Sequence, residues 1–445
     1  MSVQIADWPQ HAKTFNLNGH QGRIPCWICY NCLGRCSYFE DPELVHVSSP
    51  DYAKSRRHTK DTFRIVVDRL ENAANAGAVG ELRALETNLG VKYDEHALLW
   101  DREVRHMLEP PDCVYVDWMH TIAASGGFGQ YAINDYVLSL VEKTDIELPD
   151  IDNWCAQVKK PKGFTKLTRH LFEERVRPTR GCHLRAFASE VLTAITLLGC
   201  FTDFVIVPLA LPRLQAHIQC FLLLRCIVKI LQMGDIKRIP ELRILLQEHH
   251  RLVMELYPRS VKTKFHAGSH IPDYWELYGM LIACFSPERF HKAMKGTMRY
   301  SYNKCTQTCL ARRVHEWFIW IDEEMTYEPV HFDGAVYAIP SELRHVLHNL
   351  VEWANSIRTR WGVVGRDNLV YFKTRGCTSI GFAKGFAKLR SGDYVCMLQH
   401  CSNIVNTTNW RRLASHEVIA IDCIVETCCF VELDGDTFVP MNRIE

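Results

Sequence analysis

The stretch "PCWICYNCLGRCS", residues 25–37, places Cys26, Cys29, Cys32 and Cys36 close together. Their spacing, C-x2-C-x2-C-x3-C, is that of the iron–sulfur run in small ferredoxins. Two of these cysteines could instead supply half of a tetrahedral zinc site. All four could also be ordinary thiols. The choice among these interpretations decides the fold, because a zinc site needs a second pair of ligands elsewhere in the chain.

The iron–sulfur interpretation predicts a small redox protein, and two features of the sequence weigh against it. Ser37 follows the fourth cysteine, where the ferredoxin run has proline. No second run of this kind follows in the chain, so nothing supplies the ligands of another cluster. The iron–sulfur protein therefore remains an alternative rather than the first expectation.

The zinc interpretation finds its second pair in "KFHAGSH", where His266 and His270 form an H-x3-H motif. Two histidines four residues apart can face one metal from a single helical turn, and with Cys26 and Cys29 they would complete a Cys2His2 site. Such a site closes a loop of about 236 residues, and the entropy of loop closure grows only slowly with length. Spacing alone leaves open that both are ordinary histidines among the 21 in the chain.

Composition predicts a large globular protein of two or three domains. The chain has 445 residues, 47% of them hydrophobic and 23% charged, and its 52 Lys and Arg balance 51 Asp and Glu. This balance excludes a global attraction to polyanions, so any contact with nucleic acid must come from local patches. The 19 cysteines and an N-terminus without signal-peptide character predict an intracellular, reduced protein.

One apolar run, residues 191–211, is long enough to span a bilayer. Asp203 lies in its middle, and a central aspartate costs about 3 kcal/mol on insertion scales. We therefore expect a buried helix and no membrane partner.

The pattern along the chain predicts a mainly α-helical protein with a small β-rich C-terminal domain. Residues 2–6 and 113–116 favour short strands, and residues 8–15 favour a helix that has Pro9 in its first turn. From about residue 58 to 280, apolar residues recur at helical spacing, and two more helices are expected from 286 and from 309. After about residue 360, short β-rich runs alternate with turns.

The order of the motifs resembles that of CACTA (En/Spm-like) DDE transposases, which are cut-and-paste enzymes. In that family an aspartate, a short helix and a C-x2-C motif succeed one another, as in "DWPQHAKTFNLNGHQGRIPCWIC", residues 7–29. A helical insertion, an H-x3-H pair and an E-R-x-x-K block follow, as in "CFSPERFHKAMK", residues 284–295. "DCVYVDWMH" and "FASEVL" are similar to further family blocks within the insertion. The resemblance covers roughly residues 5–300.

The resemblance implies a zinc site made by Cys26, Cys29, His266 and His270. Cys32 and Cys36 would then be spare thiols or alternates, and Asp117 with His120 would lie in the insertion as possible alternate metal ligands or structural residues. The domains implied are a remnant of an RNase H-like core (1–25), a zinc-clamped helical insertion (26–285), returning core helices (286–330), and a helix followed by a barrel-like β domain (331–445).

The resemblance also implies two-metal catalysis by Mg2+, with Asp7 as the second catalytic acid and Glu288 as the third. No residue of this chain matches the first acid, which predicts an N-terminally truncated enzyme that does not cut DNA alone. The alternative within the same architecture is a non-catalytic DNA-binding or assembly module in which zinc is structural.

Local charge supports contact with DNA. Residues 286–313 contain seven Lys or Arg against one acid, and residues 158–185 contain nine. The predicted nucleic-acid-binding residues are Arg289, Lys292, Lys295, Arg299 and Lys304. The resemblance implies transposon ends as the DNA partner, a homo-oligomer and a nuclear location.

Overall fold

A computed structural model of the chain describes residues 4–6, 8–19, 22–34, 43–101, 103, 105, 113–162, 164–281, 283–284, 330–338, 349–359, 362–374, 377–404, 409–433 and 436–440. The chain divides into two compact units, one of residues 1–149 with 167–289 and one of residues 150–166 with 290–445. The expected helical middle and β-rich C-terminal part are both present. The helices expected from 286 and from 309 lie outside the described residues.

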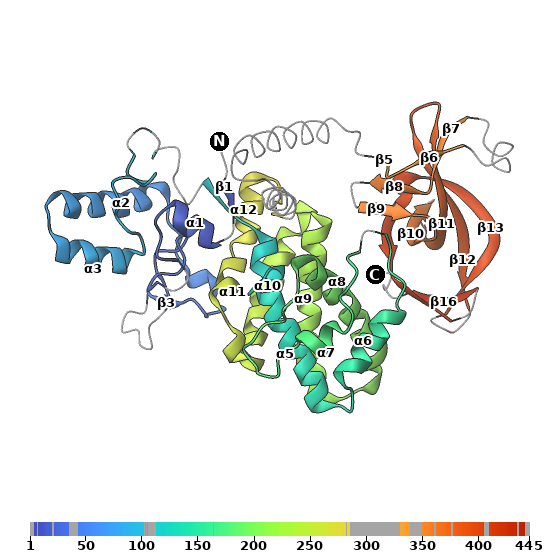
Figure 1. The fold of residues 1–445 in the computed structure, drawn as a ribbon, viewed down its shortest axis with the longest axis horizontal. Coiled ribbons are helices and arrows are strands. Elements are labelled where there is room, and N and C mark those ends of the chain that lie inside the picture. The colour runs from blue at the N-terminus through green and yellow to red at the C-terminus, as the bar shows by residue number, and fades with distance from the viewer. Residues whose placement is uncertain are drawn as a thin grey trace, which may run out of the picture. The chain divides into compact units, whose positions relative to one another are not determined.

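The first unit is mostly helical. Its α-helices in the described residues are α1 (Trp8–Thr14), α2 (Lys60–Asn75), α3 (Val79–Leu89), α5 (Phe128–Lys143), α7 (Leu171–Arg175), α8 (Ala188–Phe201), α9 (Gln215–Met233), α10 (Ile239–Leu256), α11 (Thr263–Gly268) and α12 (Ile271–Tyr278). Helices α9 and α10 lie side by side (Figure 1), and α5 and α8 pack against α9. Helix α5 is buried on almost every side, and its Tyr136 stacks on Phe221 of α9 with 4.4 Å between ring centroids.

The apolar run at residues 191–211 forms most of α8 and the short turns that follow it. Asp203 pairs with Arg225 of α9 at 2.5 Å, so its charge is neutralised within the protein. Residues 188–209 and 212–233 are each long and apolar enough to cross a membrane, yet 61% and 56% of these windows are buried inside the protein. Such burial is the feature expected of core helices.

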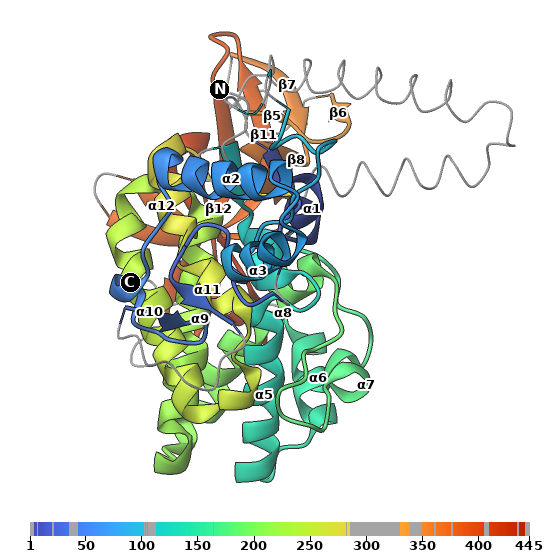
Figure 2. The ribbon, with the colours of Figure 1, turned by 90° about the vertical axis from the view of Figure 1, so that its left-hand side faces the viewer.

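Helices α2 and α3 form a hairpin, which Figure 2 shows side by side. The predicted helical spacing at the start of this region is confirmed, because Phe63, Val66 and Leu70 of α2 are all buried. Thr59 caps α2 by accepting a hydrogen bond from the backbone N–H of Thr62. Helix α3 ends at Gly90, whose left-handed backbone (φ 75°) suits a glycine.

Two short strands, β1 (Gln4–Ala6) and β4 (Val114–Val116), pair in parallel with Ala6 opposite Val116. Both strands agree with the prediction from sequence. Asp117 follows β4 directly and is buried. Asp7 follows β1 in the sequence but lies outside the described residues. In the described residues this parallel sheet has two strands, so the RNase H-like core remains a proposal.

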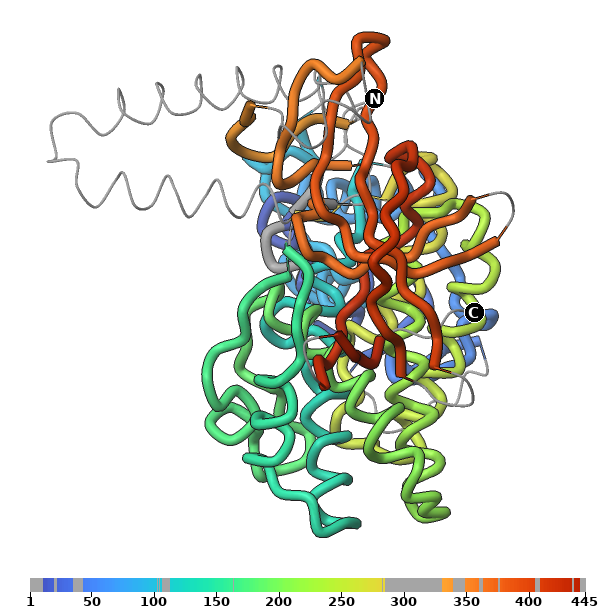
Figure 3. The backbone as a smooth tube through the Cα atoms, turned by 90° about the vertical axis from the view of Figure 1, so that its right-hand side faces the viewer, coloured from blue at the N-terminus to red at the C-terminus, as the bar shows by residue number. Residues whose placement is uncertain are grey.

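The second unit is a β half-barrel. Its strands in the described residues are β5 (His331–Phe332), β6 (Val336–Tyr337), β7 (Leu350–Ala354), β8 (Ser356–Thr359), β9 (Gly362–Gly365), β10 (Leu369–Thr374), β11 (Cys377–Leu389), β12 (Tyr394–Asn403), β13 (Trp410–Ala420), β14 (Ile424–Cys428), β15 (Phe430–Glu432) and β16 (Thr437–Pro440). The long antiparallel strands β10 to β13 curve together (Figure 3) around Phe372, Phe386 and Leu398. Residues 150–166, with most of α6 (Leu148–Gln157), belong to this unit, and Lys159 pairs with Phe430 of β15.

Candidate metal centre

Two segments that lie far apart in the sequence form the candidate metal centre. Cys26 and Cys29 lie in the loop before β2 (Cys32–Leu33), which pairs with β3 (Val45–His46). Backbone hydrogen bonds from Tyr30 N to Arg56 O (3.0 Å) and from His58 N to Ile28 O (2.8 Å) hold this loop. His266 lies in α11, and His270 precedes α12. Helix α11 and the turn that leads from it into α12 therefore present the two imidazoles to the loop.

The four side chains Cys26, Cys29, His266 and His270 form a buried cluster whose ligand atoms all lie within 4.8 Å of one another. Each residue is at most 1% exposed. His270 Nε2 lies 3.4 Å from Cys26 Sγ, 3.6 Å from Cys29 Sγ and 3.3 Å from His266 Nε2. The cluster could bind a metal such as zinc.

The distances fit the edges of a zinc tetrahedron. With Zn–S bonds of about 2.3 Å and Zn–N bonds of about 2.05 Å, sulfur–nitrogen edges are about 3.5 Å and a nitrogen–nitrogen edge is about 3.3 Å. The measured contacts of His270 Nε2 match both kinds of edge. Four protein ligands leave no open coordination position, which is typical of a structural zinc site rather than a catalytic one.

The electrostatics of the cluster favour a cation. Burial raises the pKa of Cys26, but the hydrogen bond with Cys29 and the two histidines outweigh it and hold the pKa well below its usual range. The hydrogen bond with Cys26 is the largest cause that raises the pKa of Cys29 far above its usual value, and burial raises it further. In the absence of a metal, a second negative charge beside the first is therefore disfavoured. A divalent metal would hold both as thiolates.

Cys32 lies beside the cluster but on the other side of an imidazole. Its Sγ is 3.8 Å from His266 Nδ1, whereas the Nε2 of the same ring faces His270. His266 would therefore bind a metal through Nε2 while Cys32 contacts its second nitrogen. Cys36, the last cysteine of the run, lies outside the described residues.

An aspartate that the sequence did not single out lies behind His270, on the side of the ring away from the cysteines. Asp273 Oδ2 is 3.9 Å from His270 Nδ1, and its carboxylate also pairs with Arg57 and, at 2.9 Å, with Arg243. Burial raises the pKa of Asp273, but His270 and Arg57 outweigh it and lower the pKa overall. A carboxylate that accepts the second N–H of a ligating histidine fixes the ring and raises its basicity. Asp273 is the carboxylate placed to take this role when a metal holds His270 Nε2. The spacing H-x2-D was the signal available in the sequence.

Asp273→Asn is expected to lower zinc affinity by about 10- to 100-fold, because the amide holds the imidazole of His270 less strongly. Competition with a chromophoric chelator measures this change. The matched control is Glu276→Gln, since Glu276 also pairs with Arg243, at 2.6 Å, but has no contact with His270 among the described interactions. An equal loss of affinity in the two variants would show that the arginine, rather than the carboxylate behind His270, matters.

A second cluster consists of Asp117, His120 and Cys284, whose ligand atoms also lie within 4.8 Å of one another. The Asp117 carboxylate accepts hydrogen bonds from the backbone N–H groups of Met119, His120 and Cys284, at 3.1–3.2 Å, and from His120 Nδ1. Its acceptor capacity is therefore used within the protein, and it ties the end of β4 to residue 284. No pattern in the sequence marked Cys284 as part of this cluster.

Comparison of the chain with protein-family models, curated proteins and solved structures finds no match.

The remaining predicted site residues lie outside the described residues: Asp7, Glu288, Arg289, Lys292, Lys295, Arg299 and Lys304. The predicted catalytic acids and the predicted DNA-binding patch stay predictions. The cysteine and histidine pairs are the part of the predicted site that the structure brings together.

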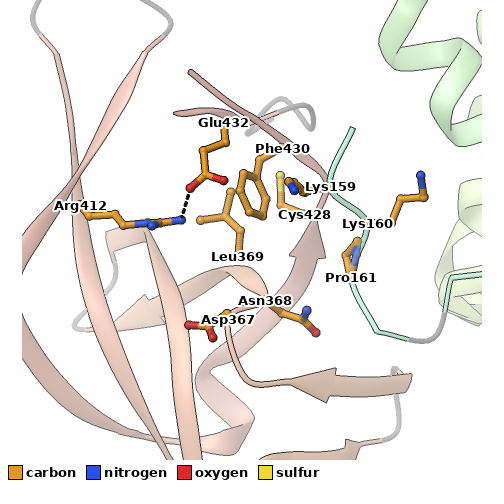
Figure 4. Close-up of a pocket in the computed structure, with 10 residues that line it drawn as sticks. All are labelled: Lys159, Lys160, Pro161, Asp367, Asn368, Leu369, Arg412, Cys428, Phe430 and Glu432. Carbon is orange, nitrogen blue, oxygen red and sulfur yellow. Dashed lines mark hydrogen bonds and ion pairs between the residues drawn. The ribbon is translucent and has the colours of Figure 1, made fainter. Parts of the chain in front are cut away.

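The β half-barrel contains a pocket of about 430 Å3, which Figure 4 shows. Its apolar lining comes from Leu369, Cys428 and Phe430, and its rim carries an ion pair between Arg412 and Glu432 at 3.1 Å. The volume lies within the range of pockets that bind small ligands. The rim holds charges of both signs, so it shows no preference for anions or cations.

Proposed function

We propose that this chain is the zinc-clamped, DNA-binding part of a CACTA-like DDE transposase. The supporting observation is the meeting of Cys26 and Cys29 with His266 and His270, which the order of the family's motifs predicted across more than two hundred residues of sequence.

In this proposal zinc has a structural role. Zinc would join the loop at residues 26–29 to α11 and the turn after it, and would so connect the two ends of the helical insertion. DNA cleavage would belong to Asp7 and Glu288 with Mg2+, and the proposal for this chain is limited to zinc and DNA binding. The partner would be the ends of a transposon, and the location nuclear.

The test combines three measurements on the purified full chain. We expect about one zinc per chain and no visible absorbance, binding to duplex DNA, and loss of zinc in Cys26→Ser. Brown protein that contains iron would overturn the proposal in favour of an iron–sulfur protein. Zinc-loaded protein that fails to bind duplex DNA at low salt would overturn the DNA-binding part.

A nicking assay with supercoiled plasmid and Mg2+ separates binding from catalysis. We expect binding without cleavage. Cleavage by the chain that disappears in Glu288→Ala would extend the proposal to an active nuclease. Cleavage that persists in this variant would point to a contaminant.

A further inference from the structure

The helical unit carries a surface on which cations gather around one histidine. We call it the His183 surface, and it consists of Tyr131, Arg177, His183, Arg185, Lys262 and Lys264. These residues come from α5, from the segment between α7 and α8, and from the start of α11 with the residue before it. Arg177, His183 and Arg185 belong to the basic stretch 158–185, and none of the six residues is among the five named as predicted to bind nucleic acid.

Contacts between side chains and backbone place these segments together. Lys264 Nζ donates to the backbone oxygen of Ser125 at 3.2 Å, and the Ser125 hydroxyl lies 3.5 Å from His183 Nε2. The rings of His183 and Tyr131 are 5.3 Å apart between centroids. Lys262 Nζ lies 5.6 Å from the centroid of the Tyr131 ring, so Tyr131 contacts both His183 and Lys262. Four segments of the chain thus meet at one place.

The charges that act on His183 from the described part of the chain are positive. Burial lowers the pKa of His183, and the positive charges of Arg185, Lys264 and Arg177 lower it further. Among the ion pairs between described residues, none includes Arg177, Arg185 or Lys262. Nearby Arg175 and Arg180 pair with Glu190 and Glu142 instead. The cations of the His183 surface repel one another, and a bound anion would relieve this repulsion.

We propose that the His183 surface binds the phosphodiester backbone of DNA. Arg185 and Lys262 are exposed, so their charged ends can reach phosphates without desolvation of a buried group. Phe187, two residues beyond Arg185, is 70% exposed and offers an aromatic face to a base. Cations beside an exposed aromatic ring are the combination that nucleic acid recognises, whereas a free phosphate would use the cations alone. The choice of DNA rests on the proposed function.

The test measures the affinity of the zinc-loaded full chain for a labelled mixed-sequence duplex by fluorescence anisotropy across a salt series. The variant is Arg177→Ala/Arg185→Ala. Loss of two phosphate contacts should weaken binding roughly 30-fold at about 0.15 M monovalent salt, and should lower the slope of log K against log salt by about 2. Lys262→Glu provides a second variant at an exposed position.

The matched control is Arg83→Ala/Lys92→Ala, which removes the same charge from exposed positions outside the surface. We expect this control to leave the slope of log K against log salt unchanged. Zinc content and circular dichroism spectra should be the same for the wild type, the variants and the control. Equal weakening in the variant and the control would overturn the His183 surface as the site, while the proposed function would stand. If the chain binds inorganic polyphosphate through Arg177 and Arg185 but binds no DNA, the assignment to DNA and the proposed function both fail.

Discussion

His266→Ala is expected to release zinc from the chain and to destabilise the helical unit. The substitution removes one of four ligands and leaves Cys26, Cys29 and His270 buried without a full coordination shell. Structural zinc contributes about 10–16 kcal/mol of apparent binding energy in zinc-finger peptides at neutral pH, and this energy stabilises only the folded state. Even a third of that amount would lower the melting temperature of a unit of this size by about 10 °C or more.

Zinc per chain by mass spectrometry and thermal melting with and without chelator measure this result. The wild type should contain about one zinc and should melt at a lower temperature after chelation. The variant should contain none and should be insensitive to the chelator. The control is His217→Ala, which removes a hydrogen bond between His217 and Tyr257 in the same unit and should keep zinc. Retention of zinc in His266→Ala would refute the Cys2His2 centre.

Helical periodicity predicted the larger part of the helical unit, because helices such as α2, α9 and α10 have an apolar face that faces the core. The Cys and His pairs were predicted as one site by motif order and not by spacing. Asp273 and Cys284 illustrate what this approach misses. Asp117 and Cys284 meet across 167 positions in the sequence, and nothing local marks such a contact.

The longest strand of the β half-barrel, β11 (Cys377–Leu389), was also not predicted. Glycines interrupt its sequence, and glycine ordinarily signals a turn. At Gly385 the structure gives the reason for glycine, because a Cβ there would lie 1.9 Å from the Trp353 ring. The packing of Trp353 from a neighbouring strand therefore requires glycine within a strand, a condition that becomes visible only once the strands are paired.

His249→Phe is expected to make the helical unit more resistant to acid. His249 lies in α10, is 1% exposed, and stacks on Phe265 with 5.9 Å between ring centroids. Burial, with a smaller contribution from His250, lowers the pKa of His249 to about 3. The unfolded chain binds this proton near pH 6.5, so the neutral imidazole stabilises the fold above that pH. This contribution falls as the pH drops toward 3, by about 5 kcal/mol in all.

Phenylalanine has a similar shape and cannot be protonated, so the variant avoids this loss. Its ring also replaces a buried Nε2 that has no hydrogen-bond partner among the described residues. Near pH 7.5 the free energies of unfolding should agree to within about 1 kcal/mol, and near pH 4.5 the variant should be more stable by roughly 3 kcal/mol. Denaturant titrations at both pH values measure the difference.

Acid also protonates the zinc ligands, and this loss is common to the wild type and the variant. The difference between the two proteins therefore isolates position 249, and a repeat with chelator-treated protein should give the same difference. His96→Phe is the matched control, because the side chain of His96 is 86% exposed and folding removes little of it from water. If the stability of His249→Phe and that of the wild type fall in parallel from pH 7.5 to 4.5, His249 is protonated in the fold and its surroundings are not apolar.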